Sequence, residues 1–324
     1  MKLIVPDLHP AAVLQAMALA QSAPDAYVIL TDERMQPLLL QSAHPLRTWP
    51  WQWPAAEGGL METELAQRIR WRKPLDELRK AGLTGVVHCA GPLDESCPSK
   101  TLAARLSASL GLPLSESTDL VDAGAVADSA APSSPRLFAH ADSLARVANM
   151  FRQVPAHKTG SFRFIWVLRH ADAARMAVQH ARELQTFLTG LSVHAVHLHV
   201  VRVVPDGVSP LLLARDDGLK RWQQVLQRCV SEADGSVVDL GAVQGLAGCG
   251  VLCAVLAHAD VVLAADGVAA RIAEGLGKLF APVQGLDVLR GADSLSGAVP
   301  VVQGGEESSL VSYICDQFPF IVKR

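Results

Sequence analysis

Short apolar runs alternate with amphipathic stretches along most of this chain. Five runs are largely apolar, at residues 2–5, 26–30, 85–90, 164–168 and 196–204. Such runs are typical of strands buried on both faces of a parallel sheet. Five further stretches are alanine-rich or have apolar residues three or four apart, and these predict helices at residues 15–21, 99–110, 141–151, 172–188 and 216–230. The alternation predicts an α/β fold, with a mostly parallel sheet flanked by helices on both faces.

The composition fits a folded protein with a large core. Of the 324 residues, 50% are hydrophobic and 19% are charged, so extended disorder is not expected. The net charge of −3 and the lack of a basic run predict no nucleic-acid partner. Six cysteines without a regular spacing favour a reducing, cytoplasmic location. No secretory leader is expected, because only three apolar residues separate Lys2 from Pro6.

The longest apolar stretch runs from Gly245 to Ala265 and contains His258 and Asp260. A charged side chain near the centre of a bilayer is costly. We therefore expect a buried helix followed by a strand, and no transmembrane segment.

The first forty-one residues have the order of elements that opens a P-loop ATPase. A strand leads into a turn from Pro6 to Leu14, then into an alanine-rich helix and a second strand that ends in Thr31 and Asp32. A phosphate-binding turn of that kind needs glycines and a lysine. This turn has neither, since the first glycine of the chain is Gly58. It also contains two prolines, which lack N–H groups.

Four segments in this order resemble the ArsA/GET3 family of anion-pump and tail-anchored-protein-targeting ATPases. Residues 1–40 match its first strand, turn and helix, with Thr31-Asp32 at its first switch. Residues 86–90 followed by Pro98-Ser99-Lys100-Thr101-Leu102 are similar to its second switch. Residues 164–205 end in Val-Arg-Val-Val-Pro, at the place where the family has the adenine-binding motif Asn-Arg-Val-x-Pro. Residues 213–238 are similar to the helix and strand that follow in the family.

The resemblance implies a P-loop NTPase-like, three-layer domain over residues 1–243. A mobile insertion is expected at about residues 112–135. Residues 244–324 would form a C-terminal α/β extension or the far edge of the same domain. Generic α/β architecture is the alternative explanation, in which case the missing motifs have no meaning.

The departures from the family all fall on its chemistry. Its two Walker A lysines correspond to Asp7 and Ala12, its second-switch aspartate to His88, and its adenine-binding asparagine to Val201. A magnesium-dependent hydrolase needs a cation, a phosphate site and a positioned water. Of these groups only Asp32 remains, as a carboxylate that could orient water. The resemblance therefore implies a degenerate Walker A motif and a pseudo-ATPase without ordinary ATP hydrolysis.

The remnant pocket is expected to be lined by Thr31, Asp32, Ser99, Lys100 and Thr101. The last three supply hydroxyls, a positive charge and the free N–H groups of a helix start, which together favour an anion. Asp32 is the one catalytic candidate. No cofactor and no metal are expected, with ATP and Mg²⁺ as the alternative.

Three functions follow from these expectations. The leading one is a cytoplasmic binding, adaptor or targeting protein that does not hydrolyse ATP and assembles with itself, an active homologue or another protein. The second is an active α/β enzyme that uses a nucleotide or phosphorylated metabolite at the carboxyl ends of the strands, through Asp32, Cys89, Asp94 and Lys100. The third is a structural subunit that docks residues 318–322 on a neighbour.

Three further groups of residues have two interpretations each. His197 and His199 share one face of a strand, as two metal ligands or as buried imidazoles. Cys249 and Cys253 share one face of a predicted helix and are interpreted either as half of a metal site or as small core residues. Three tryptophans within residues 49–53 form a partner-binding patch or close the edge of the core. The buried interpretation is preferred for all three.

Overall fold

The computed structural model of this protein describes residues 1–51, 64–91, 98–117, 134–152, 162–179, 181–182, 185, 196–204, 208–209, 216–230, 236–264 and 267–282. These residues group into two compact units. The first contains the described residues up to 117 together with 134–136, and the second contains those from 137 to 282.

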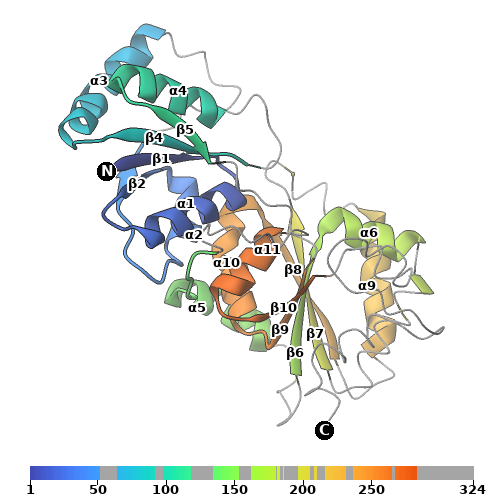
Figure 1. The fold of residues 1–324 in the computed structure, drawn as a ribbon. Coiled ribbons are helices and arrows are strands. Elements are labelled where there is room, and N and C mark those ends of the chain that lie inside the picture. The colour runs from blue at the N-terminus through green and yellow to red at the C-terminus, as the bar shows by residue number, and fades with distance from the viewer. Residues whose placement is uncertain are drawn as a thin grey trace, which may run out of the picture. The chain divides into compact units, whose positions relative to one another are not determined.

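The first unit is a parallel sheet of five strands in the order β3-β2-β1-β4-β5 (Figure 1). Helices α1 and α2 lie on one face and α3 and α4 on the other. Its elements are β1 (Lys2–Pro6), α1 (Pro10–Ser22), β2 (Tyr27–Thr31), the 3₁₀ turn η1 (Glu33–Met35), α2 (Gln36–Leu39), β3 (Thr48–Pro50), α3 (Glu64–Lys80), β4 (Gly85–Cys89), α4 (Pro98–Leu110) and β5 (Leu114–Ser117).

The turn after β1 is shorter than the sequence suggested. Helix α1 begins at Pro10, so the expected nine-residue turn is wrong and only Asp7, Leu8 and His9 connect strand to helix. Proline is favoured in the first turn of a helix because its missing N–H would have no partner there. The Nδ1 atom of His9 accepts a hydrogen bond from the Ala11 N–H at 3.2 Å and caps the helix.

The second unit is also a parallel sheet of five strands, in the order β10-β9-β6-β7-β8. Helices α5, α10 and α11 lie on one face and α6 and α9 on the other (Figure 1). Its elements are α5 (Ala141–Arg152), β6 (Phe162–Arg169), α6 (His170–Gln179), β7 (Val196–Val204), α9 (Asp217–Val230), β8 (Ser236–Gln244), α10 (Gly245–Ala257), β9 (Val261–Ala264), α11 (Gly267–Gly275) and β10 (Leu279–Pro282).

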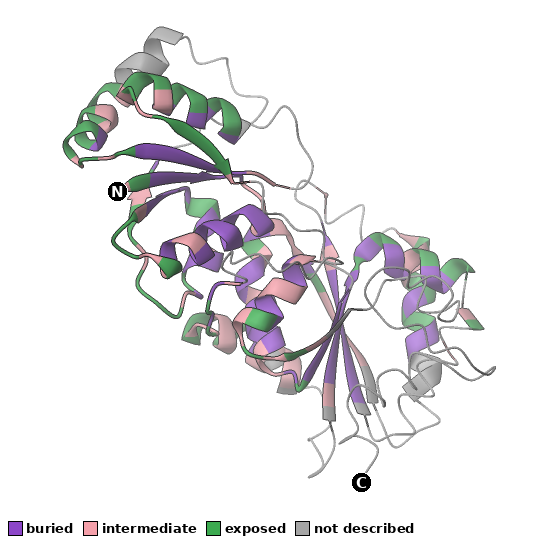
Figure 2. Ribbon diagram, in the orientation of Figure 1, coloured by how far each residue is buried: buried purple, intermediate pink, exposed green. Residues whose placement is uncertain are grey.

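The core of each unit lies between its sheet and its helices, and the central strands are buried along much of their length (Figure 2). In the second unit Trp166 of β6 meets Trp222 of α9 edge to face, with ring centroids 6.5 Å apart. Helices α6 and α9 approach closely at Gly218, where an added Cβ would lie 2.8 Å from the Cβ of Ala174. The sheet and its two helices are therefore packed without room for a larger side chain at that position.

The α/β class and the parallel pairing are confirmed, but the strands form two sheets and not one. The expected domain boundary at residues 243 and 244 lies within the last two residues of β8, inside the second unit. The expected insertion begins with strand β5, which pairs with β4, and residues 118–133 lie outside the described residues. Residues 318–322 and Asp94 also lie outside them.

The apolar stretch from Gly245 forms helix α10 followed by strand β9, as expected. Among the helices of the described residues, none is both long and apolar enough to cross a membrane. Cys249 and Cys253 are buried in α10 without a disulfide, which confirms their interpretation as core residues. Trp51 is also buried and lies edge to face against Trp71 of α3, with ring centroids 5.4 Å apart.

Candidate functional site

The carboxyl ends of β1 and β4 bring a buried carboxylate beside a buried imidazole. Asp7 directly follows β1, and its N–H donates to the carbonyl of Cys89 at 2.9 Å. Its Oδ1 atom lies 3.2 Å from Nε2 of His88, and its Oδ2 atom accepts a hydrogen bond from the N–H of Gly91. Carboxylates in the interior need such donors, because burial removes their hydration.

His88 occupies the penultimate position of β4, and its side chain is 2% exposed. Its Nε2 atom also lies 2.9 Å from the hydroxyl oxygen of Ser99, the second residue of α4. Its Nδ1 atom is buried and has no hydrogen-bond partner among the described residues. Three elements, β1, β4 and α4, thus meet at one ring nitrogen.

Gly91 is packed tightly against this pair. A Cβ at position 91 would lie 3.1 Å from Oδ2 of Asp7 and 3.1 Å from the Cβ of His9. Glycine therefore lets the backbone approach the carboxylate closely enough for its N–H to donate.

Cys89 is not an activated nucleophile. Burial, and then the negative charge of Asp7, raise the pKa of its thiol to about 12. The thiolate is the reactive form of cysteine, so Cys89 stays a neutral thiol near neutral pH. A thiol in this state is a poor nucleophile, which weighs against a nucleophilic role for Cys89 in the second sequence interpretation.

The five expected pocket residues fall into two groups. Thr31 and Asp32 end β2, whereas Ser99, Lys100 and Thr101 begin α4, which follows β4. Strand β1 lies between β2 and β4 in the sheet.

In the first group, the Thr31 hydroxyl donates to the carbonyl of Trp49 at 3.3 Å. Asp32 caps η1 by accepting a hydrogen bond from the backbone N–H of Arg34 at 2.9 Å, and it also forms an ion pair with the side-chain Nε of Arg34 at 2.7 Å. These contacts give Asp32 a structural role in the turn.

In the second group, Ser99 is buried against His88, while Lys100 and Thr101 are exposed. Lys100 lies 3.0 Å from Glu116 of β5. The hydrogen bond from Lys100, and then its positive charge, lower the pKa of Glu116. The Lys100 ammonium therefore lies at the surface, paired with Glu116.

A second polar cluster lies between the sheet of the second unit and helices α6 and α9. Arg202 of β7 has its Nε atom 3.2 Å from Oδ2 of Asp239 in β8. Asp239 also accepts from Nε1 of Trp222 at 3.2 Å and from the N–H of Gly241 at 2.8 Å. The Nη1 atom of Arg202 lies 3.1 Å from Nδ1 of His170, the first residue of α6.

The contact with Arg202 fixes the tautomer of His170. A guanidinium group can only donate, so Nδ1 of His170 must accept and the ring proton is on Nε2. That atom lies 3.4 Å from Oδ2 of Asp216 but is not aligned for a hydrogen bond to it. Asp216 in turn caps α9 by accepting from the N–H of Gly218 at 2.8 Å.

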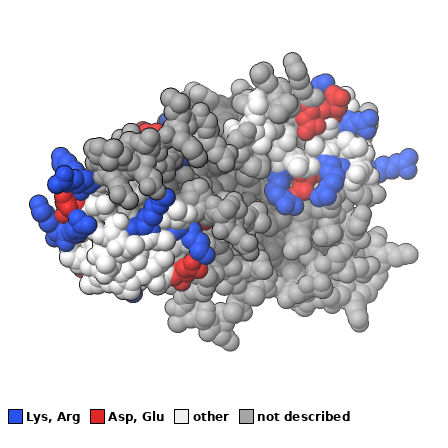
Figure 3. Space-filling model, turned by 90° about the horizontal axis from the view of Figure 1, so that it is seen from above, with Lys and Arg blue, Asp and Glu red and all other residues white. Residues whose placement is uncertain are grey.

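Two exposed arginines contact the first turn of α6: Arg169 is the last residue of β6, and Arg175 lies in the middle of the helix. Nε of Arg169 and Nη2 of Arg175 lie 2.6 Å and 2.8 Å from the two carboxylate oxygens of Asp172. The arginine side chains are 70% and 48% exposed, while that of Asp172 is buried. Figure 3 shows basic side chains gathered beside acidic ones on the described surface of both units. Two cations thus contact one carboxylate, while a second carboxylate, that of Asp216, lies 3.4 Å from His170 at the same helix start.

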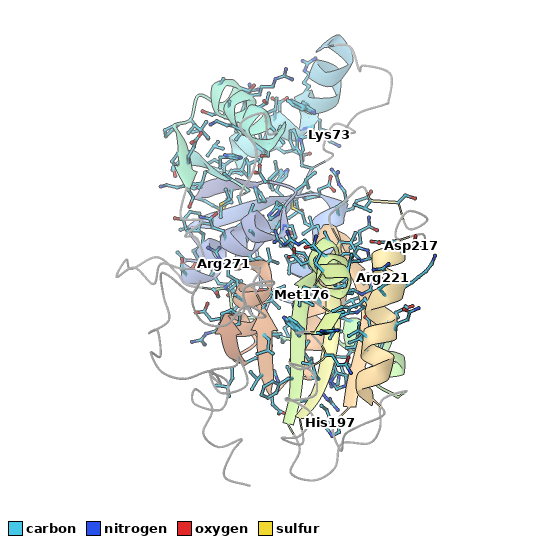
Figure 4. All side chains as sticks on the ribbon, turned by 90° about the vertical axis from the view of Figure 1, so that its right-hand side faces the viewer. Lys73, Met176, His197, Asp217, Arg221 and Arg271 are labelled. Carbon is cyan, nitrogen blue, oxygen red and sulfur yellow. The ribbon has the colours of Figure 1, made fainter. Side chains whose placement is uncertain are left out.

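The two histidines of β7 lie away from this cluster. His197 lies near the amino end of the strand, whereas Asp217 marks the start of α9 at the opposite end of the sheet (Figure 4). Both imidazoles are buried, as expected, and the ring of His199 lies 5.5 Å from that of Phe151. Among the described residues there is no group of three or more potential metal ligands.

Sequence reasoning missed the second cluster and undervalued the first. Asp7 and His88 entered as departures from ATPase motifs, Arg202 entered only within the Val-Arg-Val-Val-Pro segment, and His170 and Asp239 were not considered. A usable signal was present in the strands. Arg202 interrupts the apolar run of β7 near its carboxyl end, and a charged residue buried in such a strand needs a partner.

Comparison with known proteins gives a likeness of fold. No protein-family model and no curated protein sequence matches this chain. The structure of the glycosyl transferase family 9 from Veillonella parvula DSM 2008 is similar over 100% of this chain and 97% of its own, with 10% sequence identity and a TM-score of 0.53. The E. coli ADP-heptose lps heptosyltransferase II covers 86% of this chain and 82% of its own, with 12% identity and a TM-score of 0.49. The likeness of fold rests on the first of these.

This likeness overturns the resemblance to ArsA/GET3 ATPases and the pseudo-ATPase function that followed from it. A strand, a turn and an alanine-rich helix in that order occur in α/β folds generally, so their order does not identify a P-loop protein. The turn without glycine is therefore no degenerate Walker A motif. It is a short connection that places Asp7 beside His88.

Proposed function

We propose that this protein transfers a sugar from a nucleoside-diphosphate sugar to a hydroxyl group of an acceptor. The observation that carries the proposal is the full-length likeness to a family 9 glycosyl transferase, which includes both parallel sheets. The polar clusters support it, because ligands of open α/β sheets bind at the carboxyl ends of the strands. The proposal agrees with the sequence-based alternative of an active α/β enzyme that uses a nucleotide there.

The reaction needs a group that removes a proton from the acceptor. As the acceptor O–H loses its proton, its oxygen forms a bond to the anomeric carbon of the donor sugar. The bond from that carbon to the diphosphate oxygen breaks, and the nucleoside diphosphate leaves with the electron pair. We assign the proton acceptor to Asp7, whose carboxylate lies at the carboxyl end of β1 and is held by the N–H of Gly91.

The departing diphosphate needs positive charge and N–H donors. In the second unit, the exposed side chains of Arg169 and Arg175 both contact Asp172 in the first turn of α6. Helix starts supply N–H groups and a favourable dipole for phosphates. We therefore propose the start of α6 as a candidate anion site of the second unit, considered by itself. The anion site expected at Ser99, Lys100 and Thr101 remains a separate proposal, for which the exposed Lys100 is the residue to substitute.

The test is turnover of a panel of UDP-, GDP- and ADP-sugars by the purified protein, measured as release of the nucleoside diphosphate. We expect release from at least one donor, and a loss of about 100-fold or more in Asp7→Asn, the range for removing a general base. Asp76→Asn is the matched control, because Asp76 is an exposed aspartate of α3. The proposal fails if every donor of the panel is inert, or if Asp7→Asn is as active as wild type.

A further inference from the structure

We infer that His88 is a positioning residue, a neutral hydrogen-bond donor that holds the Asp7 carboxylate in place. This inference deepens the proposed function, in which Asp7 is the proton acceptor. It concerns which nitrogen of the imidazole ring carries the proton, which the surrounding atoms determine.

The contacts of Nε2 require the ring proton to be on that atom. Nε2 lies 3.2 Å from Oδ1 of Asp7, and an ionised carboxylate can only accept a hydrogen bond. A lone pair on Nε2 would face another lone pair at that distance. The Ser99 hydroxyl, 2.9 Å from the same nitrogen, either accepts or donates and therefore does not oppose this assignment.

The other ring nitrogen, Nδ1, is buried and has no acceptor to which a second ring N–H could donate among the described residues. An imidazolium would place an N–H donor there without an acceptor, and a buried donor without a partner is costly. The neutral ring leaves only a lone pair at Nδ1. His88 is therefore a donor to Asp7 and not a second base.

The arrangement fixes both oxygens of the Asp7 carboxylate. Oδ1 faces the imidazole of β4 and Oδ2 faces the N–H of Gly91, which follows the same strand. Ser99 contacts the imidazole from the start of α4. A base held in this way loses little freedom when the acceptor binds, which is how supporting residues contribute to catalysis.

The direct test is the tautomer of His88 in the wild-type protein. Long-range ¹H–¹⁵N NMR of protein labelled at histidine distinguishes the two ring nitrogens, and His88→Gln assigns the signal by its loss. We expect a protonated Nε2 and an unprotonated Nδ1 at neutral pH. A proton on Nδ1, alone or in an imidazolium, would overturn the inference.

Two substitutions test the positioning role. The amide nitrogen of glutamine reaches about as far as Nε2 of histidine, whereas that of asparagine reaches only about as far as Nδ1. We expect His88→Gln to keep the Gly91 amide resonance, which reports the adjacent carboxylate, and to keep kcat within about threefold. His88→Asn should shift that resonance and lower kcat at least tenfold with little change in KM. His44→Asn, in an exposed loop, is the control.

The two readouts separate the inference from the proposed function. If wild type shows the expected tautomer and the Gly91 resonance responds as expected, but no sugar donor is turned over, the proposed function fails and the positioning role stands. If the Gly91 resonance in a folded His88→Asn variant matches that of wild type, the positioning role is wrong whatever the activity. Should His88→Asn not fold, the wild-type tautomer and His88→Gln still decide the matter.

Discussion

Substitutions in the buried pair of Arg202 and Asp239 should change the free energy of unfolding in a direction that follows from the groups around the pair. The two side chains are 7% and 14% exposed, so both charges are largely removed from water. Substitution Arg202→Met removes the cation and leaves the Asp239 carboxylate inside. Removing one partner of a buried ion pair costs about 3–5 kcal/mol.

Asp239 keeps two donors in that variant, from Trp222 and from the N–H of Gly241. We therefore expect the lower part of the range, about 3 kcal/mol, in the free energy of unfolding. Adding Asp239→Asn removes the remaining charge. The asparagine oxygen can replace only one of the two carboxylate oxygens, which accept separately from Gly241 and from Trp222, but a buried charge without a partner costs more than one lost hydrogen bond. The double variant should be more stable than Arg202→Met alone, with a coupling energy of about 1 kcal/mol or more.

The measurement is urea unfolding of wild type, both single variants and the double variant, followed by circular dichroism and by tryptophan fluorescence. Arg221→Met on α9 is the control, because Arg221 is exposed and the same number of charges is lost (Figure 4). The reasoning is refuted if Arg202→Met costs less than about 1 kcal/mol, where a surface pair would lie. It is equally refuted if the double variant is less stable than Arg202→Met.

Three other predictions follow from single contacts. Cys89, with a thiol pKa raised to about 12, should resist iodoacetamide at pH 8 in the folded protein and react once urea unfolds it. Gly218→Ala should cost about 1–3 kcal/mol of unfolding free energy, because its Cβ would lie 2.8 Å from that of Ala174; adding Ala174→Gly should recover part of the loss. Burial, and then the charges of Arg163 and Lys278, lower the pKa of His258. As the pH drops below about 6.5, the unfolded chain therefore binds a proton at this histidine before the folded protein does, and the free energy of unfolding should fall. In unfolding titrations between about pH 7 and pH 5, His258→Gln should make this dependence on pH less steep, and an unchanged slope would contradict the prediction.

Local structure was largely predictable because it depends on nearby residues. The apolar runs gave β1, β4, β6 and β7, and the helices at residues 99–110 and 141–151 are present within one or two residues. The start of α1 was missed because Pro10 was interpreted as part of a turn. Proline in fact favours the first turn of a helix.

The division into two sheets was not predictable, because strand order depends on contacts between distant segments. Strand β4 pairs with β1 across about eighty residues, and β9 pairs with β6 across two intervening strands. An apolar run indicates that a strand is buried, but it does not indicate which strand lies beside it. The resemblance to ArsA/GET3 ATPases led to the wrong prediction of sheet topology, because it rested on an order of elements that many α/β proteins share.

The candidate site was hidden for the same reason. His88 and Asp7 are 81 positions apart, and Arg202 and Asp239 are 37 apart. Each residue alone is an ordinary polar side chain in or next to a strand. Only the register of the sheets brings them within hydrogen-bond distance, and the sequence contains no spacing rule for such pairs.

The position of bond cleavage tests the central proposal most directly. A nucleoside-diphosphate sugar that the protein turns over would be incubated with it in H₂¹⁸O without an acceptor, so that water takes the acceptor's place, and both products would be analysed by mass spectrometry. Sugar transfer breaks the bond at the anomeric carbon and predicts ¹⁸O in the released sugar. Recovery of ¹⁸O in the nucleotide would mean that water attacked phosphorus, and it would contradict the proposed function.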